Sequence, residues 1–584
     1  MSERKKIPYS ITNFERIRTE NYFYVDKTRF IEQLENEEAQ YHFLIRPRKF
    51  GKSLFTSVLD HYYDIRFADR FQELFGDLYI GQKPTKLKNS YFVLKFDCSA
   101  LDTSDIESFK RSFTSAIRDS IVTFITEHRF VIENSEELKK EVRQLNDVRS
   151  YINFAFDIIE SFGKKAYIII DEYDHFANDI IAKGQRYSPQ SLPSCGEAGG
   201  RSQYEESIWA NSVTRDFYET LKIGTKTVID RMFITGITPI MLDDITSGFN
   251  ISNNISLAPD YNEILGLTRE EADWVMEQIR LDKSLIGVDI EQMYNGYLFN
   301  KHAKNKVFNS TMILNYFHGL FKYGNHFEDL VDNNLKTDYG RINNLINQYD
   351  NKEKLRQLVD NNTIDGELVK QFSIESVHEE NNFFSLLFYI GLVTIDNSNP
   401  LNVGFKIPNY SVKTIFWEYI KRMLTEEVKG ISIDSSKYRG SIYTMAYKDD
   451  YNPFFEYFSN YIVKYLSNRD LQGTEEKDMK FLLLPIFFTS NYYLPISELE
   501  NSEGYTDIYL KRSHLHPKSI SEWIFELKYV KQAEDTKLIE KKKNEAKEQL
   551  LRYKKSNWFK DRQDVRYLSI VFIGKKDYLI DEVI

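Results

Sequence analysis

The stretch "FLIRPRKFGKSLF", residues 43–55, decides how the first half of this chain folds. Its apolar first residues predict a short buried strand, and the apolar residues that recur at helical spacing after the loop predict a helix. Lys52 and Ser53 begin that helix, where backbone N–H groups and the helix dipole favour an anion. The order of strand, loop and helix predicts a phosphate-binding loop, although Arg46 and Pro47 stand where such loops usually begin with glycine. A lone GKS tripeptide is a weak signal, so a chance match stays open at this point.

Short apolar runs alternate with helical stretches through the first part of the chain. They are "YFVLKF" at 91–96, "AYIII" at 166–170 and "MFITGI" at 232–237. Fully apolar strands separated by helices are typical of a parallel sheet covered on both faces. The pattern predicts an α/β fold, with a doubly wound sheet domain over residues 1–260.

Polar residues follow two of these strands. The run "AYIIIDEYD" ends in Asp171 and Glu172, and the strand in "RMFITGITPI" ends near Thr235. Ser53 and Asp171 are predicted to hold Mg²⁺, Glu172 to polarise the attacking water, and Thr235 to sense the γ-phosphate of ATP. For Asp171 and Glu172, the alternative to a catalytic role is that they are solvated acids at the end of a buried strand. For Thr235, the alternative is an ordinary strand and turn.

Composition limits the class of protein. The 584 residues, 15% of them aromatic, are enough for several domains, and the net charge of −10 restricts nucleic-acid contacts to local patches. Two cysteines, Cys98 and Cys195, exclude a disulfide scaffold and a cysteine zinc site and fit a reducing compartment. The polar N-terminus and the short apolar runs predict a cytoplasmic protein without a membrane partner.

The middle of the chain, residues 261–465, has a mainly helical pattern. Within it, residues 383–420 contain a helix, two short strands around an Asn/Pro turn, and a second helix. This order is typical of a winged-helix-like unit.

The last block, residues 470–584, carries a second set of chemical groups. Glu526 and Lys528 share one face of a predicted strand, because side chains alternate along it. Asp507 opens the preceding strand, and a hairpin would bring it beside Glu526. Two carboxylates suit Mg²⁺ or Mn²⁺, a lysine can activate water for phosphodiester attack, and Glu476 would support them from the preceding helix. An edge hairpin with solvent-facing charges is the alternative.

The N-terminal motifs carry a family resemblance. The run "NYFYVDKTRF" at 21–30, followed by "RPRKFGKS" at 46–53, resembles the bacterial AAA-ATPase-like family of P-loop proteins, with Lys49 in place of an arginine. "YNGYLF" at 294–299 and "FKIPNYSV" at 405–412 extend the resemblance. It implies that the Arg–Pro opening is a family variant of a working ATP site. The residues that it implies bind the nucleotide are Arg48, Phe50, Gly51, Lys52, Ser53 and Leu54.

The same resemblance implies a C-terminal domain similar to the PD-(D/E)XK nucleases. Gln549 matches a glutamine of that pattern, whereas Met479 and Lys480 replace an aromatic residue and a His or Gln. We therefore expect an ATP-binding and hydrolysing protein coupled to a metal-dependent nuclease that acts on DNA, in defence or genome conflict. The alternative is an ATP-dependent switch or scaffold that binds nucleic acid or protein without cutting. The oligomeric state is left open, a homo-oligomer being one option.

Overall fold

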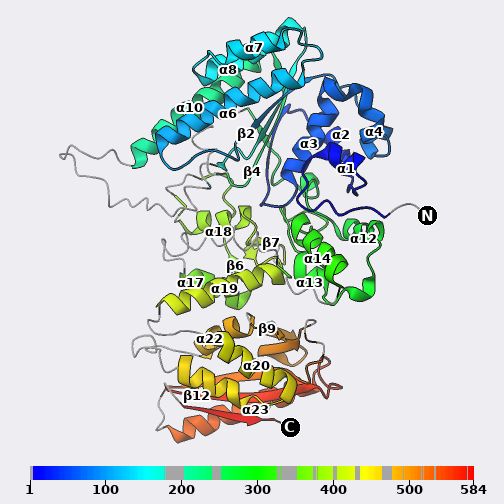
Figure 1. The fold of residues 1–584 in the computed structure, drawn as a ribbon. Helices are drawn as coiled ribbons and strands as arrows, with labels where there is room; N and C mark the ends of the chain where they lie inside the picture. Colours follow the sequence, from blue (N-terminus) through cyan, green and yellow to red (C-terminus); the bar gives the residue numbers. More distant parts are fainter. Residues whose placement is uncertain are drawn as a thin grey trace, which may run out of the picture.

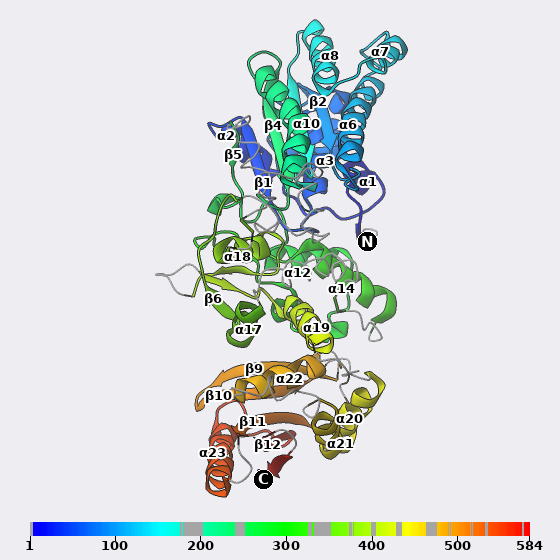
Figure 2. The same cartoon turned by 90° about the vertical axis from the view of Figure 1, so that its left-hand side faces the viewer.

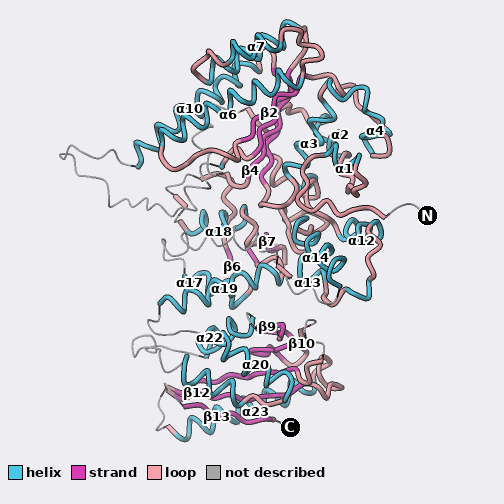
Figure 3. The backbone as a smooth tube through the Cα atoms, viewed as in Figure 1, coloured by secondary structure: helices cyan, strands magenta, loops and turns pink. Residues whose placement is uncertain are grey.

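The computed structural model places three parts one above the other (Figures 1 and 2). The parallel sheet with its helices lies at the N-terminal end, a mainly helical region lies in the middle, and a second sheet lies at the C-terminal end (Figure 3). The structure describes residues 4–175, 178, 203–239, 251–324, 330–331, 352–372, 376–377, 379–398, 404–427, 435–462, 476–488, 490, 492–513, 516, 518–531, 535–574 and 577–583.

The N-terminal sheet has five parallel strands in the order β2-β3-β4-β1-β5, which confirms the predicted fold class. The core strands are apolar and buried, as a sheet covered on both faces requires. Because the strands are parallel, the loop after β1 and the acids after β3 lie at the same edge of the sheet, where the strands end. The two strands are not neighbours, because β4 lies between them. The bounds are β1 Tyr41–Ile45, β2 Phe92–Asp97, β3 Ala166–Asp171, β4 Ile229–Gly236 and β5 Asn253–Asn254.

Helices cover this sheet on both sides. Helix α3 and the short N-terminal helices lie on one side, and α6, α8 and α10 on the other (Figure 1). Aspartates cap α6 and α8, where Asp105 and Asp147 accept hydrogen bonds from first-turn N–H groups. The helices are α1 Phe14–Thr19, α2 Arg29–Asn36, α3 Lys52–Tyr63, α4 Phe71–Phe75, α5 Tyr79–Gln82, α6 Ile106–Glu127, α7 Ser135–Val142, α8 Val148–Ser161 and α10 Gln203–Gly224, with a 3₁₀ turn at Ile65–Arg70.

The middle region is mainly helical, as predicted. Its helices are α12 Arg269–Gln278, α13 Ile290–Tyr294, α14 Ser310–Tyr323, α17 Lys352–Asn361, α18 Glu380–Tyr389 and α19 Tyr410–Glu427, and its 3₁₀ turns are Pro259–Tyr261 and Lys283–Leu285. Helix α18, strands β7 (Thr394–Asp396) and β8 (Gly404–Lys406), and helix α19 follow the order expected for 383–420. A third strand, β6 (Thr363–Asp365), completes an antiparallel sheet in the order β6-β8-β7.

The C-terminal sheet is mixed, with the order β13-β12-β11-β10-β9. Strands β9 to β11 are antiparallel neighbours, β12 is parallel to β11, and β13 returns antiparallel to β12. The bounds are β9 Tyr493–Asn501, β10 Gly504–Arg512, β11 Glu522–Val530, β12 Val565–Ile573 and β13 Asp577–Glu582; the helices are α20 Ser435–Lys448, α21 Asn452–Tyr457, α22 Glu476–Phe488 and α23 Thr536–Lys555, with a π-helical turn at Phe458–Ile462.

Helices α22 and α23 pack on opposite faces of this sheet. Phe525 of β11 contacts Phe487 of α22 at a ring separation of 5.8 Å, whereas Ile524 packs with Leu550 of α23. Alternation along β11 thus directs Trp523, Phe525 and Leu527 to one face and Glu526 and Lys528 to the other. No helix in the described parts of the chain is long and apolar enough to cross a membrane.

Candidate active sites

The loop between β1 and α3 has the backbone of an anion site. Gly51 precedes the helix with φ 104°, and Lys49 also has a positive φ of 68°. A Cβ at Gly51 would meet no atom within 4 Å, so the space on that side of Gly51, next to the helix N-terminus, is open. The loop therefore leaves room for a group at the position where the helix dipole favours negative charge.

The carbonyl groups of this loop accept hydrogen bonds from residues of the middle region. Arg48 O accepts from Asn309 Nδ2 at 3.1 Å, Lys49 O from Thr311 N and Oγ1 at 3.2 and 3.0 Å, and Phe50 O from Gly266 N and Ser310 Oγ, both at 3.2 Å. These donors lie in and before the first turn of α14 and in the segment preceding α12. All three carbonyls therefore point toward the middle region.

The N–H groups that follow these carbonyls point the other way. In a trans peptide the C=O of one residue and the N–H of the next are antiparallel, and the chain has no cis bond among its described residues. In the part of the chain that the structure describes, no acceptor bonds the N–H of Lys49, Phe50 or Gly51. Three adjacent donors facing an open space form a nest for phosphate oxygens, so the loop fits a nucleotide.

Arg46, the residue that replaces the first glycine, is a buried structural group. It is 1% exposed, and its guanidinium donates to the carbonyls of Ile45, Ser256 and Tyr261 at 2.9, 2.7 and 2.8 Å. It also lies over the Phe299 ring at 4.0 Å. Burial lowers the pKa of Arg46 to about 9. Arg46 thus fastens the start of the loop to the chain beyond β5.

Lys52 and Ser53 extend from the start of α3 toward the end of β3. Lys52 is buried, and its Nζ donates to the carbonyls of Arg46 and Pro47 at 2.9 and 3.1 Å. Burial lowers the pKa of Lys52, and nearby Asp171 opposes that shift. Burial raises the pKa of Asp171 to about 6, against a hydrogen bond with the Ser53 side chain that lowers it. The structure therefore brings Lys52, Ser53 and Asp171 together.

Glu172 lies next to this group on a strained backbone. Its φ is 53°, in the left-handed region that non-glycine residues seldom adopt. His175 Nδ1 is 3.7 Å from Glu172 Oε2. This contact with His175, and after it the charge of Lys52, lower the pKa of Glu172. Glu172 is therefore held as a carboxylate beside the loop, the state that positioning a water requires.

Thr235 does not face this space. Its side chain is fully buried and its hydroxyl donates to Leu44 O at 2.9 Å within the sheet. The chain beyond β4 is instead held by Asp174, which accepts from the backbone N–H of Ile237 and Thr238 and from the Thr238 hydroxyl. The geometry favours a structural position for Thr235, and its predicted role as a phosphate sensor stays a prediction.

An apolar cavity of about 90 Å³ opens beside the loop. Phe50, Gly51 and Leu54 line it from the loop and α3, and Tyr24 and Leu267 from the chain on either side. Lys27 of the YVDKT element also lines this cavity. Its Nζ is 2.7 Å from the Glu271 carboxylate and 2.9 Å from Glu263 O. Leu54 and Phe50 thus contact a space next to the phosphate nest rather than the nest itself.

The second site lies on the C-terminal sheet. Ile508 pairs with Phe525, which sets Asp507 one residue beyond the pair, opposite Glu526. Asp507 Oδ2 accepts from Leu527 N at 2.7 Å, and Lys528 Nζ donates to Glu526 Oε1 at 2.9 Å. Asp507, Glu526 and Lys528 are therefore together on the face of the sheet that α23 partly covers.

Two of these groups are buried in the structure. Side-chain alternation along a strand predicts which face they share but not what covers that face. Glu526 is 2% exposed and Lys528 is 6% exposed, because α23 packs over β11 and buries the two charges as a pair. Asp507 alone is half-buried.

Helix α23 adds a residue that sequence reasoning missed. Tyr553 donates to Tyr505 O at 2.6 Å, and burial, with the nearby charges of Glu526 and Asp507, raises its pKa. Gln549 also contacts Tyr553. Tyr553 follows Gln549 by four residues, and residues at this spacing share one face of a helix. This spacing is the sequence pattern from which Tyr553 could have been predicted.

Helix α22 supplies the third predicted carboxylate. Glu476 begins this helix, but its side chain lies outside the described residues. Met479 is fully buried and Lys480 is 7% exposed. Among the side chains that are described, no three His, Cys, Asp or Glu gather closely enough to hold a metal. Asp507 and Glu526 supply the oxygen ligands that a hard divalent cation prefers, so the residues present fit such an ion in part.

Comparison with known proteins assigns both ends of the chain. Residues 8–246 match the family described as predicted AAA-ATPase, and residues 474–582 match the PD-(D/E)XK nuclease superfamily. The chain joins an AAA-ATPase-like domain to a PD-(D/E)XK nuclease-like domain. It is also 25% identical over 315 residues to an uncharacterized protein in the vnfD 5′ region of Azotobacter chroococcum mcd 1, covering 53% of this chain. The match spans 52% of that relative, about half its length.

Proposed function

We propose that the protein is an ATPase whose nucleotide cycle controls a metal-dependent nuclease that acts on DNA. The observation that carries the ATPase half is the nest of three N–H groups in front of Gly51, with Lys52, Ser53 and Asp171 beside it. The nuclease half is supported by the pairing that sets Asp507 opposite Glu526, next to Lys528.

In the ATPase half, each group has one task. The N–H groups of the loop hold the phosphates, and Lys52 leaves the loop carbonyls to reach the β- and γ-phosphates. Ser53 and Asp171 would hold Mg²⁺, which neutralises charge that develops on the phosphates when it is bound. Glu172, kept ionised by its neighbours, orients the water for attack. Phe50 and Leu54 line the apolar cavity on the middle-region side of the loop and would support the loop from there.

In the nuclease half, Asp507 and Glu526 would hold Mg²⁺ or Mn²⁺, with Glu476 supporting them. The bound ion would supply charge stabilisation to the phosphodiester. Lys528 offsets the charge of Glu526 and lies where it can orient a water. Asp507, half-buried, is the carboxylate that substrate can reach.

One experiment tests both halves. Purified protein is incubated with single- and double-stranded DNA and RNA, with and without ATP, and with Mg²⁺, Mn²⁺ or EDTA. The proposal predicts ATP turnover in Mg²⁺ and DNA cutting that needs a divalent ion. ATP turnover together with binding but no cutting of any nucleic acid would instead favour the scaffold.

The scaffold has one observation in its favour. The Glu526–Lys528 ion pair is almost fully buried, with a separation of 2.9 Å, and a buried pair can serve the fold rather than chemistry. In that case the domain binds nucleic acid or protein and the ATPase acts as its switch. A Glu526→Gln variant distinguishes the nuclease from the scaffold. A nuclease should lose its metal-dependent cutting with this carboxylate, whereas a scaffold has no cutting to lose.

A further inference from the structure

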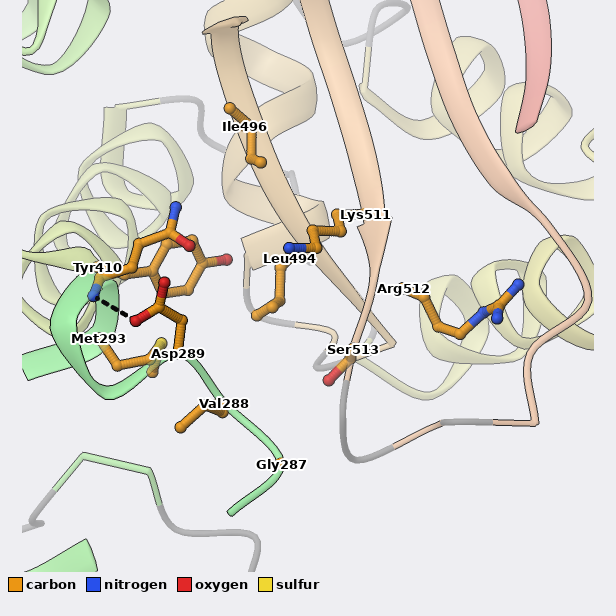
Figure 4. Close-up of a pocket in the computed structure, with 11 residues that line it drawn as sticks. Gly287, Val288, Asp289, Met293, Tyr410, Leu494, Ile496, Lys511, Arg512 and Ser513 are labelled. Atoms are coloured by element: carbon orange, nitrogen blue, oxygen red, sulfur yellow. Dashed lines mark hydrogen bonds between the residues drawn. The ribbon is translucent and has the colours of Figure 1, made fainter. Parts of the chain in front are cut away.

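A groove lies between the middle region and the free edge of the C-terminal sheet. It consists of two adjoining cavities, of about 570 and 260 Å³, whose linings share Gln292, Tyr410 and Ile496. Helices α13 and α19 form one wall, and strands β9 and β10 form the other (Figure 4). We call this the interdomain groove.

The interdomain groove runs along the strand that carries Asp507. Tyr505 lines the larger cavity and Lys511 the smaller one, and both belong to β10. Side chains two residues apart share a face of a strand, so Tyr505, Asp507 and Lys511 point to the same side. Asp507 lines neither cavity, but along β10 it lies between Tyr505 and Lys511, on the same face as both.

The charges of the groove suit a polyanion. Lys306 and Lys511 are exposed, and neither has an ion-pair partner in the part of the chain that the structure describes. The lining holds four cations, Lys306, Lys413, Lys511 and Arg512, against two acids, Asp289 and Glu291. Asp289 accepts from the Glu291 and Gln292 N–H groups, and Glu291 bonds Arg269 at 3.2 Å. The groove is therefore a cationic strip on a chain with a net charge of −10.

Tyr505 adds an aromatic surface to this strip. Its side chain is 54% exposed, although its backbone carbonyl is fixed by the Tyr553 hydroxyl. An exposed ring on a rigid strand, flanked by lysines, offers a base a stacking partner while the phosphates contact the cations. A duplex keeps its bases stacked inside, so it cannot use the ring.

We propose that the interdomain groove binds a single-stranded polynucleotide and delivers it to Asp507. The inference rests on the proposed nuclease function and adds the form of the substrate and its path. Lys306, from the middle region, and Lys511, from the sheet, hold the phosphates, and Tyr505 stacks a base. Both sides of the boundary between the regions then contribute to one binding surface.

The test measures binding without cutting. Full-length protein is titrated into fluorescein-labelled oligo(dT), oligo(U) and a duplex of equal length, in EDTA, at several salt concentrations, with anisotropy as the readout. Each of Lys306→Ala and Lys511→Ala should flatten the slope of log K against log salt by about 0.7. Tyr505→Ala should weaken binding by about 5-fold to about 150-fold, and Tyr505→Phe should restore it. Lys164→Ala, an exposed lysine of the ATPase-like domain, is the matched control and should change nothing.

The outcomes separate the two proposals. If the wild type binds single strands but the three groove variants match it, the groove is not the path, whereas the nuclease proposal stands. Tighter binding of the duplex than of either single strand overturns the single-strand assignment. A wild type that neither binds nor cuts any nucleic acid overturns the proposed nuclease function and the groove with it. Melting curves of the variants show whether they are folded.

Discussion

Replacing Arg46 tests whether the start of the phosphate loop is held by a buried cation. Its guanidinium makes two hydrogen bonds to carbonyls beyond β5 and lies over Phe299. Hydrogen bonds from a charged donor contribute about 1.5–3 kcal/mol each, and a desolvated cation–π contact contributes about 2 kcal/mol. Burying the charge costs several kcal/mol in return, the cost that lowers the pKa of Arg46 to about 9. We expect Arg46→Ala to lower the unfolding free energy by about 3 kcal/mol, near the cost of other large-to-small core substitutions.

The assay is thermal unfolding with and without Mg–ATP. For a unit of 150–250 residues, a loss of about 3 kcal/mol lowers Tm by roughly 6–12 °C. ATP should stabilise the wild type, because a ligand that binds only the folded state raises Tm, and Arg46→Ala should lose most of that gain. Arg46→Met keeps the volume without the charge and shows how much of the effect is packing. Lys49→Ala is the control, because that side chain is exposed and, within the described part of the chain, only the Lys49 carbonyl is hydrogen-bonded.

A Tm within 2 °C of wild type for Arg46→Ala, with the ATP shift intact, would refute this reasoning. The loop would then be held by the contacts of the Arg48, Lys49 and Phe50 carbonyls alone. Equal losses in Arg46→Ala and Lys49→Ala would also count against it, because they would mean that any change in the loop has the same effect.

Other substitutions test the remaining contacts. Lys52→Ala should abolish the ATP-dependent rise in Tm, whereas Glu172→Gln should keep it and slow ATP turnover by at least about tenfold, both read from melting curves and phosphate release. Gly236→Ala should cost about 2 kcal/mol or more in a urea titration, because its Cβ would lie 2.4 Å from Asp174 Oδ1. Glu526→Gln should remove metal-dependent cutting. Both Glu526→Gln and Glu526→Ala remove the counter-charge of the buried Lys528, so both should destabilise the C-terminal domain, the alanine variant by about 3–5 kcal/mol and the glutamine variant by less, because its amide oxygen can still accept a hydrogen bond from Lys528.

The parallel sheet could be predicted because its signal is local. Each core strand is a short apolar run between helical stretches, and the residues of the phosphate loop are contiguous in sequence. The order of Lys52 and Ser53 at a helix start could therefore be predicted from the sequence alone. The role of Arg46 was not visible, because its acceptors, Ser256 and Tyr261, lie more than 200 residues away and no pattern marks a residue that donates to backbone carbonyls.

For the candidate nuclease site, the sequence predicted which side chains share a face of the sheet, but not how deeply they are buried. Alternation along β11 was enough to place Glu526 and Lys528 on one face, because that rule depends only on backbone geometry. What covers the face depends on where α23 returns, which is a tertiary property. The same limit applies to Thr235, whose place at a strand end was predicted, whereas the hydrogen bond to Leu44 depends on the order of the strands.

The bonds from Gly266, Asn309 and Thr311 to the phosphate loop bear on how the protein can be divided for experiments. A fragment that ends where the AAA-ATPase match ends, at residue 246, would lack every one of these donors and both distant acceptors of Arg46. The carbonyl groups of its phosphate loop would accept hydrogen bonds from water instead. The N–H groups opposite these carbonyls would then no longer be held in a fixed direction. Failure of such a fragment to bind nucleotide would therefore say nothing about the whole chain, and the shortest piece worth purifying extends through α14, to residue 324.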